Sequence, residues 1–525
     1  MTGTITNPIL PGFNPDPSFL CVGEDYYIAT STFEWFPGVQ IHHSRDLVHW
    51  ELIAHPLQRL SQLDMTGNIN SGGIWAPCLT YDNGTYYLIY TDVKSRRGAF
   101  KDTHNYLVTA KDIRGPWSDP VYLNSSGFDP SLFHDEDGRK WLLNMLWDFR
   151  KGRNSFAGIL LQQYSADTEQ LIGPVYNIFK GTALGLTEGP HLYQRNGFYY
   201  LMTAEGGTKY EHAVTVARAK SITGPYEVDP EGPMLTSVDQ PELALQKAGH
   251  GSLIETHTSE WYLAHLCGRP VVEEYCILGR ETALQRCYWT EEGWLRLEGG
   301  GHAPAVEVQA PAIPAAPAKP MPDKDDFDAA ELSLHWNTLR LPPDPSWLSL
   351  TARQGHLRLH GRESMSSLHA QSLVARRQQS FQFEAETIVE FEPEHFQQMA
   401  GLILYYDTDD YVYLRLTHLE GVGKVLGIIQ SVAGQYDELL DEDVVIEGSA
   451  RCYLKAVVHR ERLQFQYSLD GDAWQNIGPE IDIRHLSDDY AELVRFTGTF
   501  VGMCVQDLAG TRKHADFDYF RYTEL

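Results

Sequence analysis

The sequence predicts an all-β protein of two domains, a five-bladed β-propeller followed by a β-sandwich. Its 525 residues are more than one hydrophobic core comfortably accommodates, so at least two domains are expected. Long helical patterns are scarce, and short apolar or aromatic runs bounded by Gly, Asp, Asn and Pro dominate. In addition, one strand pattern recurs five times in the N-terminal part, which indicates a repeat architecture.

The recurring pattern is an aromatic–aromatic–aliphatic strand, preceded in most copies by a turn such as "DNG" or "RNG". Successive copies are 60, 55, 58 and 62 residues apart, counted from the first residue of each core. Such a unit is too short for a domain and too long for one hairpin, so each copy is expected to be a blade of about four strands. A large sandwich or barrel with coincidental similarity is the alternative. The cores start at Tyr26, Tyr86, Trp141, Tyr199 and Trp261.

A stretch dense in Ala and Pro, "APAVEVQAPAIPAAPAKP", divides the chain. It has no amphipathic period and is expected to be a semi-extended connector. We predict a propeller domain over residues 1–305, a linker over 306–324 and a sandwich domain over 325–525. Period-2 strands such as "FQFEAETIVEFE" indicate the sandwich. Its acidic run "DTDD" (residues 407–410) is expected to be a solvated loop.

The charge balance excludes several classes of partner. A formal net charge of −28 provides no positive field to attract nucleic acid or an anionic membrane. The sequence has no signal-peptide pattern, and no apolar run reaches the roughly 18 residues of a membrane-spanning helix, so a cytoplasmic protein is expected. Seven scattered cysteines contain no C-x-x-C pair and are expected to be free thiols.

The repeat also locates a candidate site. In each copy a polar or aromatic residue precedes a small residue or Pro and then an apolar strand. Because the innermost strand of every blade lines the propeller axis, residues at equivalent positions should converge on one point. These equivalent residues, 10 to 12 positions before the aromatic cores, are Asp16, Trp75, Asp129, Glu188 and His250.

Three carboxylates and an imidazole at one point imply chemistry, because close like charges repel and give no structural benefit. Paired carboxylates beside aromatic walls are typical of glycoside hydrolysis, in which an acid protonates the leaving oxygen and a carboxylate activates water or attacks carbon. Taken singly, Asp16 between two prolines would more often be a turn residue, and His250 a satisfied buried histidine. Their joint occurrence at equivalent repeat positions favours the catalytic interpretation.

Motifs along nearly the whole chain resemble glycoside hydrolase family 43, in particular its two-domain β-xylosidases. They include "GFNPDPS", "SGGIWAP", "GFDPSLFHD", "TEGPHLY", "GHGSL", "LGRETA" and "ADFDYFRY". The resemblance implies a propeller, a jelly-roll sandwich and exo-acting release of D-xylose from the non-reducing ends of β-1,4-xylo-oligosaccharides, with α-L-arabinofuranosidase as a side activity. An α-L-arabinofuranosidase or arabinanase, a retaining sucrose-type enzyme and a non-catalytic sugar-binding propeller are the alternatives.

The resemblance also implies residue roles. Asp16 is the expected general base, Glu188 the general acid and Asp129 a third carboxylate that tunes and orients the acid. His250 is expected on the axis, and Arg280 in "LGRETA" in contact with the sugar hydroxyls. The reaction would then be a single-step inversion, in which water attacks the anomeric carbon and loses a proton to the base. A nearby Asp129 anion would keep Glu188 protonated by repulsion.

Flat aromatic side chains are expected to wall the pocket, since they suit the face of a pyranose ring. Trp75 is a candidate by its axis-facing repeat position and Phe33 by resemblance. An aromatic of the sandwich in "RFTGTF", Phe496 or Phe500, is expected to help close the mouth, leaving room for one terminal sugar. We expect no essential metal or cofactor, with calcium near His250 as an option, and a homo-oligomer, dimer or tetramer.

Overall fold

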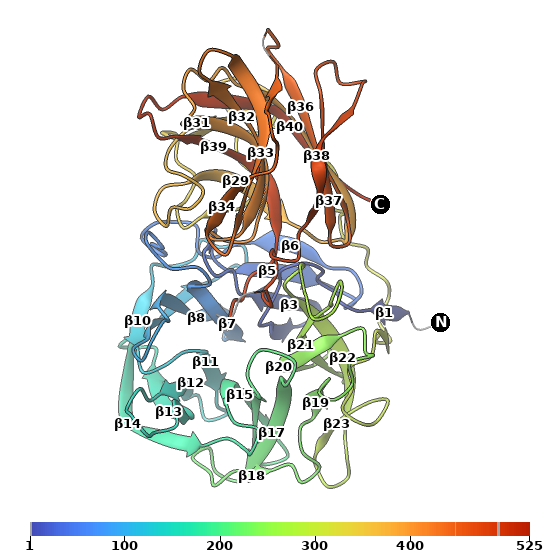
Figure 1. Cartoon of the computed structure of the whole chain (residues 1–525). Coiled ribbons are helices and arrows are strands. Elements are labelled where there is room, and N and C mark those ends of the chain that lie inside the picture. Colours follow the sequence, from blue (N-terminus) through green and yellow to red (C-terminus); the bar gives the residue numbers. More distant parts are fainter. Residues whose placement is uncertain (1–2, 447, 491–493) are drawn as a thin grey trace.

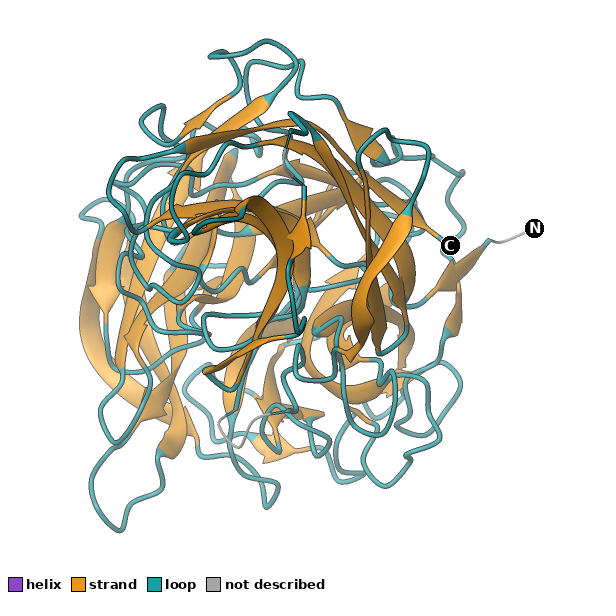
Figure 2. Ribbon diagram, turned by 45° about the horizontal axis from the view of Figure 1, so that its top comes forward, coloured by secondary structure: helices purple, strands orange, loops and turns teal. Residues whose placement is uncertain are grey.

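Every regular element of the described chain is a β-strand, and the strands form two bodies (Figures 1 and 2). The computed structural model describes residues 3–446, 448–490 and 494–525. The N-terminal body is a ring of five blades, and the C-terminal body is a sandwich of two sheets above the ring in Figure 1. The predicted propeller–sandwich architecture is confirmed.

Each blade is an antiparallel sheet whose second strand carries the aromatic core of one repeat. Four blades have four strands, and β19 extends the remaining one. In chain order the blades comprise β2 (Ser18–Val22), β3 (Asp25–Thr30), β5 (Gln40–Ser44) and β6 (Glu51–Ala54); β7 (Gly73–Asp82), β8 (Thr85–Ser95), β9 (Asp102–Ala110) and β10 (Val121–Asn124); β11 (Ser131–His134), β12 (Lys140–Trp147), β13 (Phe156–Ser165) and β14 (Gln170–Phe179); β15 (Glu188–Arg195), β16 (Phe198–Glu205), β17 (Ala213–Ala219), β18 (Glu227–Val228) and β19 (Leu235–Thr236); and β20 (Gln246–Glu255), β21 (Trp261–Gly268), β22 (Arg280–Trp289) and β23 (Leu295–Leu297).

Hydrogen bonds between neighbouring innermost strands tie the blades together around the axis. The Phe19 amide donates to Ser252 Oγ at 2.9 Å, which joins the fifth blade to the first. The Leu79 amide donates to Ser18 Oγ at 2.9 Å, which joins the first blade to the second. Each serine lies two residues after a predicted site residue, so hydrogen bonds between blades fix the strands next to Asp16 and His250.

Part of the predicted linker is a strand of the propeller body. β24 (Glu307–Gln309) pairs antiparallel with β1 (Thr4–Thr6). Further along, the Ala316 amide donates to Asp46 Oδ2 at 2.8 Å. The connector therefore lies against the propeller body, first beside β1 and then at Asp46 of the first blade. All seven cysteines are unpaired, as predicted, and the described residues include no helix long and apolar enough to cross a membrane.

The sandwich packs its two sheets around the largest apolar cluster of the described chain. Strands such as β36 (Cys452–His459) alternate between buried and more exposed side chains, which is the period-2 pattern expected of a half-buried sheet. One sheet comprises β25 (Lys324–Asp325), β27 (Leu348–Ser349), β28 (Leu357–His360), β30 (Gln382–Glu390), β36 (Cys452–His459), β37 (Arg462–Ser468), β38 (Gln475–Asp482) and β40 (His514–Glu524), and the other β29 (Ser372–Arg377), β31 (Gln398–Tyr405), β32 (Tyr411–Leu419), β33 (Gly423–Val432), β34 (Gln435–Glu438), β35 (Val444–Val445) and β39 (Phe500–Asp507).

The two bodies share an extensive buried contact. β4 (Trp35–Phe36) of the propeller pairs with β26 (Thr338–Leu339) of the C-terminal domain. The Trp35 ring stacks on Phe500 with a centroid distance of 3.6 Å, and both side chains are fully buried. The interface therefore has an apolar cluster of its own, which joins side chains of the propeller to side chains of β29, β31 and β39.

The prediction that the acidic run 407–410 is solvated is wrong. Asp407 and Asp410 are 2% and 0% exposed. Arg495 Nη1 lies 2.7 Å from Asp410 Oδ2 and 3.4 Å from Asp407 Oδ2, and Asn70 of the propeller donates to Thr408 Oγ1 at 2.7 Å. The run is an interface turn, because a buried cation and the facing domain satisfy acids that would otherwise require water.

Candidate active site

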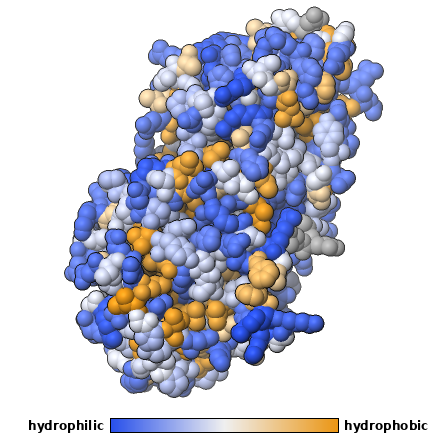
Figure 3. All heavy atoms as spheres, turned by 90° about the vertical axis from the view of Figure 1, so that its left-hand side faces the viewer, coloured by the Kyte–Doolittle hydropathy of each residue, from blue (hydrophilic) through white to orange (hydrophobic). Residues whose placement is uncertain are grey.

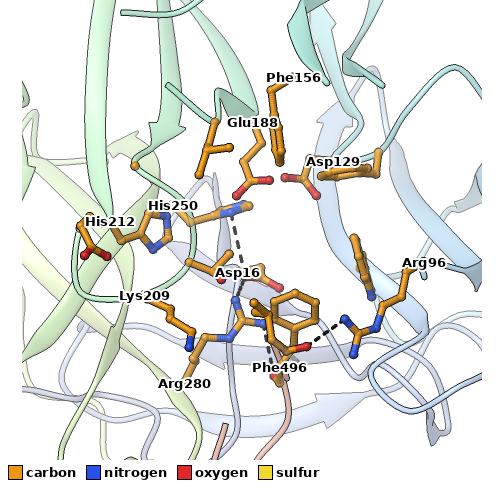
Figure 4. Close-up of a pocket in the computed structure, with 18 of the residues that line it drawn as sticks. Asp16, Arg96, Asp129, Phe156, Glu188, Lys209, His212, His250, Arg280 and Phe496 are labelled. Carbon is orange, nitrogen blue, oxygen red and sulfur yellow. Dashed lines mark hydrogen bonds and ion pairs between the residues drawn. The ribbon is translucent and has the colours of Figure 1, made fainter. Parts of the chain in front are cut away.

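The five residues at equivalent repeat positions line one pocket of about 480 Å³ (Figure 4). Asp16 and Asp129 each precede the innermost strand of their blade by two residues, and Glu188 opens β15. Trp75 and His250 lie within β7 and β20. The convergence inferred from the repeat is thus observed. Arg280, Phe33 and Phe496 line the same pocket, so it contains all eight predicted site residues.

A left-handed backbone conformation recurs where the inner strands begin. Asp16, Asp129 and His250 have φ angles of 54°, 54° and 49°. Non-glycine residues seldom adopt this region, and each instance costs on the order of 1–3 kcal/mol. Three such residues at equivalent positions mean that the fold maintains strain in order to direct these side chains at the axis.

Asp16 is surrounded by donors. Ser31 Oγ donates to Asp16 Oδ2 at 2.6 Å, and Arg280 Nη1 donates to Oδ1 at 3.2 Å. His250 Nδ1 lies 3.9 Å from the same oxygen. Hydrogen bonds and a cation favour the charged form of a carboxyl group. This environment therefore suits a residue that must act as a carboxylate.

Glu188 and Asp129 have the opposite environment, and Figure 4 shows their carboxyl groups facing each other. Burial, and then the Asp129 and Asp16 charges, raise the pKa of Glu188 well above its ordinary value. Burial and Asp16 raise the pKa of Asp129 to about 8, although the Gly189 amide donates to Asp129 Oδ2 at 3.1 Å. Neither acid forms an ion pair within the described part of the chain. Glu188 is thus suited to hold a proton at neutral pH. With a pKa of about 8, Asp129 becomes the anion expected from the sequence only at higher pH.

His250 lies beside Asp16 and packs closely against Gly189. Burial lowers the pKa of His250, and the nearby Asp16 charge only partly opposes this effect. Gly189 has a φ of 56°, and a Cβ there would lie 3.0 Å from His250 Cε1, so glycine is needed at this approach. Among the described residues, His250 belongs to no group of three side chains with metal-ligand spacing. The protein side chains alone therefore do not form a calcium site around His250.

Aromatic rings from both domains form the wall of the pocket. Phe33 and Trp75 of the propeller lie 5.7 Å and 5.3 Å, centroid to centroid, from Phe496 of the sandwich. Phe500 instead turns inward and stacks on Trp35. Of the two sandwich candidates, Phe496 therefore reaches the pocket and Phe500 belongs to the core.

The propeller holds the backbone around Phe496 through three contacts. Arg280 Nη2 donates to the Phe496 carbonyl at 3.2 Å, and the Phe496 amide donates to Ser71 Oγ at 3.1 Å. Arg96 Nη1 donates to the Val494 carbonyl at 2.9 Å. Because Arg280 contacts both Asp16 and Phe496, it couples the predicted base to the wall supplied by the second domain.

Several lining residues were not predicted from the sequence. They lie near the end of, or shortly after, the second strands of blades two, three and four. In antiparallel blades these strand ends reach the same pole as the beginnings of the innermost strands, so the repeat contained a signal for them. Those with polar or aromatic side chains include Arg96, Lys101, Trp147, Lys209, Glu211 and His212.

Similarity to known proteins covers both domains. Residues 5–295 match glycosyl hydrolases family 43, and residues 324–523 match the β-xylosidase C-terminal concanavalin A-like domain. A β-xylosidase of Bacillus subtilis (strain 168) is 52% identical over 99% of both chains. A xylosidase/arabinosidase of Humicola insolens is 50% identical over 99% of this chain and 97% of that protein.

A solved structure agrees with the fold in detail. The crystal structure of xylan β-1,4-xylosidase from Bacillus halodurans C-125 is 65% identical to this chain, with a TM-score of 0.98. The match covers 99% of this chain and 100% of the solved one. Since family models match both domains and the relatives match nearly the whole chain, the chain belongs to glycosyl hydrolase family 43.

Proposed function

We propose that the protein is an inverting exo-β-xylosidase that releases D-xylose from the non-reducing ends of β-1,4-xylo-oligosaccharides. The observation that carries this proposal is the contrast among the buried acids of one pocket. Asp16 accepts bonds from Ser31 and Arg280, whereas the pKa of Glu188 is raised by burial and by its acidic neighbours. A carboxyl group surrounded by donors and another surrounded by acids are the different environments that a general base and a general acid require.

In the proposed reaction, Asp16 takes a proton from water while the water oxygen forms a bond to the anomeric carbon. The glycosidic bond breaks, and the departing oxygen takes the proton of Glu188. Asp129 is proposed to support the acid, because negative charge on the neighbouring Asp129 raises the pKa of Glu188. Arg280 and His250 are proposed to bind the sugar hydroxyls, while Trp75, Phe33 and Phe496 form the apolar wall.

The contacts of Phe496 support exo action. Phe496 of the sandwich contacts the rings of both Phe33 and Trp75, and Arg280 fixes its carbonyl. In the proposed binding mode, this side of the pocket limits the space to one terminal xylose, and the rest of the oligosaccharide remains outside. The names of the similar enzymes from Bacillus subtilis and Bacillus halodurans favour xylosides as substrates.

The stereochemistry of the first product tests the mechanism. Proton NMR of an aryl β-xyloside digest, recorded before mutarotation, should show α-xylose as the first anomer. Initial release of β-xylose would mean retention and would contradict the assignment of Asp16 as a base.

An α-L-arabinofuranosidase is the second candidate, supported by the xylosidase/arabinosidase of Humicola insolens. Both activities would use the same three acids, so the ratio of kcat/KM values on aryl β-xyloside and aryl α-arabinofuranoside decides between them. A non-catalytic sugar-binding role would require loss of a catalytic acid, and all three are present.

We further propose that catalysis needs no metal and that the enzyme works in the cytoplasm as a homo-oligomer. The outer strand β14 of the third blade exposes Ile172 and Val175, with 38% and 54% of their surface accessible. Figure 3 shows apolar patches on this side of the propeller. Light scattering would test the dimer or tetramer, and activity after chelation with EDTA would test the metal.

A further inference from the structure

The C-terminal sandwich touches the segment that leads to Asp16. Arg377, the last residue of β29, donates from Nε to the Phe13 carbonyl oxygen at 2.7 Å. Arg377 is 5% exposed, and its guanidinium carbon lies 5.5 Å from the centre of the Phe13 ring. A buried side chain of the sandwich thus holds the backbone of the propeller at Phe13. Phe13 lies three residues before the proposed base, Asp16.

This contact is unusual because Arg377 has no counter-ion. No described carboxylate lies within ion-pair distance of its guanidinium, Nη1 donates to Asn337 Oδ1 at 3.1 Å, and Nη2 has no partner. Burial alone lowers the pKa of Arg377 to about 9. A buried unpaired cation costs stability, and an apolar residue of similar size would often serve better. A role in stability alone does not account for an arginine here.

A second contact shows how tightly the sandwich fits this segment. Gly12 has a φ of 77°, and a Cβ there would lie only 2.5 Å from the Gln378 carbonyl oxygen. The Phe13 ring packs between Phe33, which walls the pocket, and Phe500 of the sandwich, at centroid distances of 5.7 Å and 6.0 Å. The segment therefore lies directly against the second domain.

The segment depends on such anchors because residues 11–17 form no regular strand. The Gly12 amide donates to Glu281 Oε1 at 2.8 Å, and the Asn14 amide donates to the Arg280 carbonyl at 2.9 Å. Both of these anchors belong to the fifth blade. Arg377 supplies the hydrogen bond to Phe13 between them, and it comes from the other domain.

We propose that Arg377 is a positioning residue for Asp16: the sandwich sets the direction of the base by holding Phe13. This rests on the proposed function, in which Asp16 is the base. Effective base catalysis requires near-ideal geometry, and a misplacement of about 1 Å can cost about 100-fold in rate. The second domain then acts on the reaction from the base side as well as through the pocket wall at Phe496.

The chain offers a matched control in Arg376. This neighbour on β29 is 7% exposed, has no ion pair among the described residues and stacks over Tyr522 with 4.2 Å between its guanidinium carbon and the ring centre. Within the described part of the chain, its guanidinium donates to Gln379 Oε1 at 3.1 Å and forms no hydrogen bond to the Asp16 segment. Arg377→Met and Arg376→Met thus remove equally buried cations, and only the first releases Phe13.

For Arg377→Met we expect kcat on xylobiose to fall about 10- to 100-fold with KM within about 3-fold. Arg376→Met should stay within about 2-fold in both. Sodium azide localises the defect, because azide attacks the anomeric carbon without giving up a proton. Its nitrogen forms the new bond, the glycosidic bond breaks, and the departing oxygen takes the proton of Glu188. Azide should therefore restore substrate consumption by Arg377→Met, with xylosyl azide as product.

Equal kcat losses in the two folded variants, or no response of Arg377→Met to azide, would overturn the proposal. If Arg377→Met does not fold, Arg377→Lys keeps the cation but loses the Nε donor, and the same pattern is expected with a smaller loss. The variant Asp16→Ala distinguishes a failure of the positioning role of Arg377 from a failure of the role of Asp16 as the base. An inactive Asp16→Ala together with equal losses at positions 376 and 377 refutes only the positioning role, whereas an active Asp16→Ala refutes the proposed base itself.

Discussion

Two groups of buried acids lie within the same molecule and have opposite surroundings. In the pocket, Glu188 and Asp129 face each other without a cation in ion-pair contact. At the domain interface, Asp488 and Asp489 lie 3.2 Å and 2.7 Å from Lys247 Nζ. Burial acts to lower the pKa of Lys247, but the facing carboxylates help raise it overall. The interface acids are paired, and the pocket acids are not.

The difference separates a structural use of buried charge from a chemical one. A buried carboxylate that contacts a buried ammonium loses less free energy on leaving water, and it ties two surfaces together. A buried acid beside another acid gains nothing structural, and its raised pKa reduces stability at neutral pH. The fold accepts this cost in the pocket because protonation states are what the proposed reaction uses. The comparison predicts that the two groups respond to substitution in opposite ways.

Glu188→Ala should have the largest effect, and on activity. On xylobiose, kcat should fall about 100- to 10,000-fold, because the departing sugar needs a proton. On an aryl xyloside with a good leaving group, the fall should be much smaller. Thermal unfolding should show no loss of stability, since no ion pair is removed. Equal falls on both substrates would mean that Glu188 is not the acid.

Lys247→Met should instead act mainly on stability. It leaves Asp488 and Asp489 buried without their cation, and breaking a buried pair costs about 3–5 kcal/mol. Denaturant unfolding measures this loss. The exposed pair of Arg45 and Asp25 is the control, since solvent screens it and Arg45→Met should cost far less stability than Lys247→Met. A Lys247→Met loss as small as the control would remove the distinction between the two groups of acids.

Asp129→Asn should change stability less than Lys247→Met does, and in the favourable direction. The pKa of Asp129 in the folded protein, about 8, exceeds the ordinary value of 3.8, so the folded protein binds this proton more tightly than the unfolded chain does. The stability that this proton contributes is therefore fully present below about pH 4 and is lost as the pH rises towards 8. Asparagine does not titrate and accepts the same left-handed backbone. We expect the free energy of unfolding to rise relative to the unsubstituted protein at pH 8, and this gain should be absent at pH 4.

The same variant tests the coupling to the acid. Without Asp129, one of the charges that raise the pKa of Glu188 is absent, so the alkaline limb of kcat against pH should move to lower pH. An unchanged limb would show that Asp129 does not act on the acid, whatever happens to the melting temperature.

The propeller was predictable because its evidence is repetitive. Five aromatic cores at nearly equal spacing predict five blades, and rotation about one axis then predicts that Asp16, Asp129 and Glu188 converge. The same reasoning could have extended to the ends of the second strands, where Lys101 and Lys209 were missed. The interface had no comparable signal. The run 407–410 looked solvated because its partner Arg495 lies far along the chain.

By itself, the sequence determined the fold class, the number of blades and the five axial residues, because these follow from periodicity along the chain. Tertiary structure alone decided which sandwich aromatic enters the pocket, Phe496 and not Phe500, and which buried acids have cations. It also decided that Arg377 holds the backbone before Asp16, a contact between residues 364 positions apart. The physical reason is that a repeat relates each residue to its own copies, whereas docking of two domains relates residues that share no pattern.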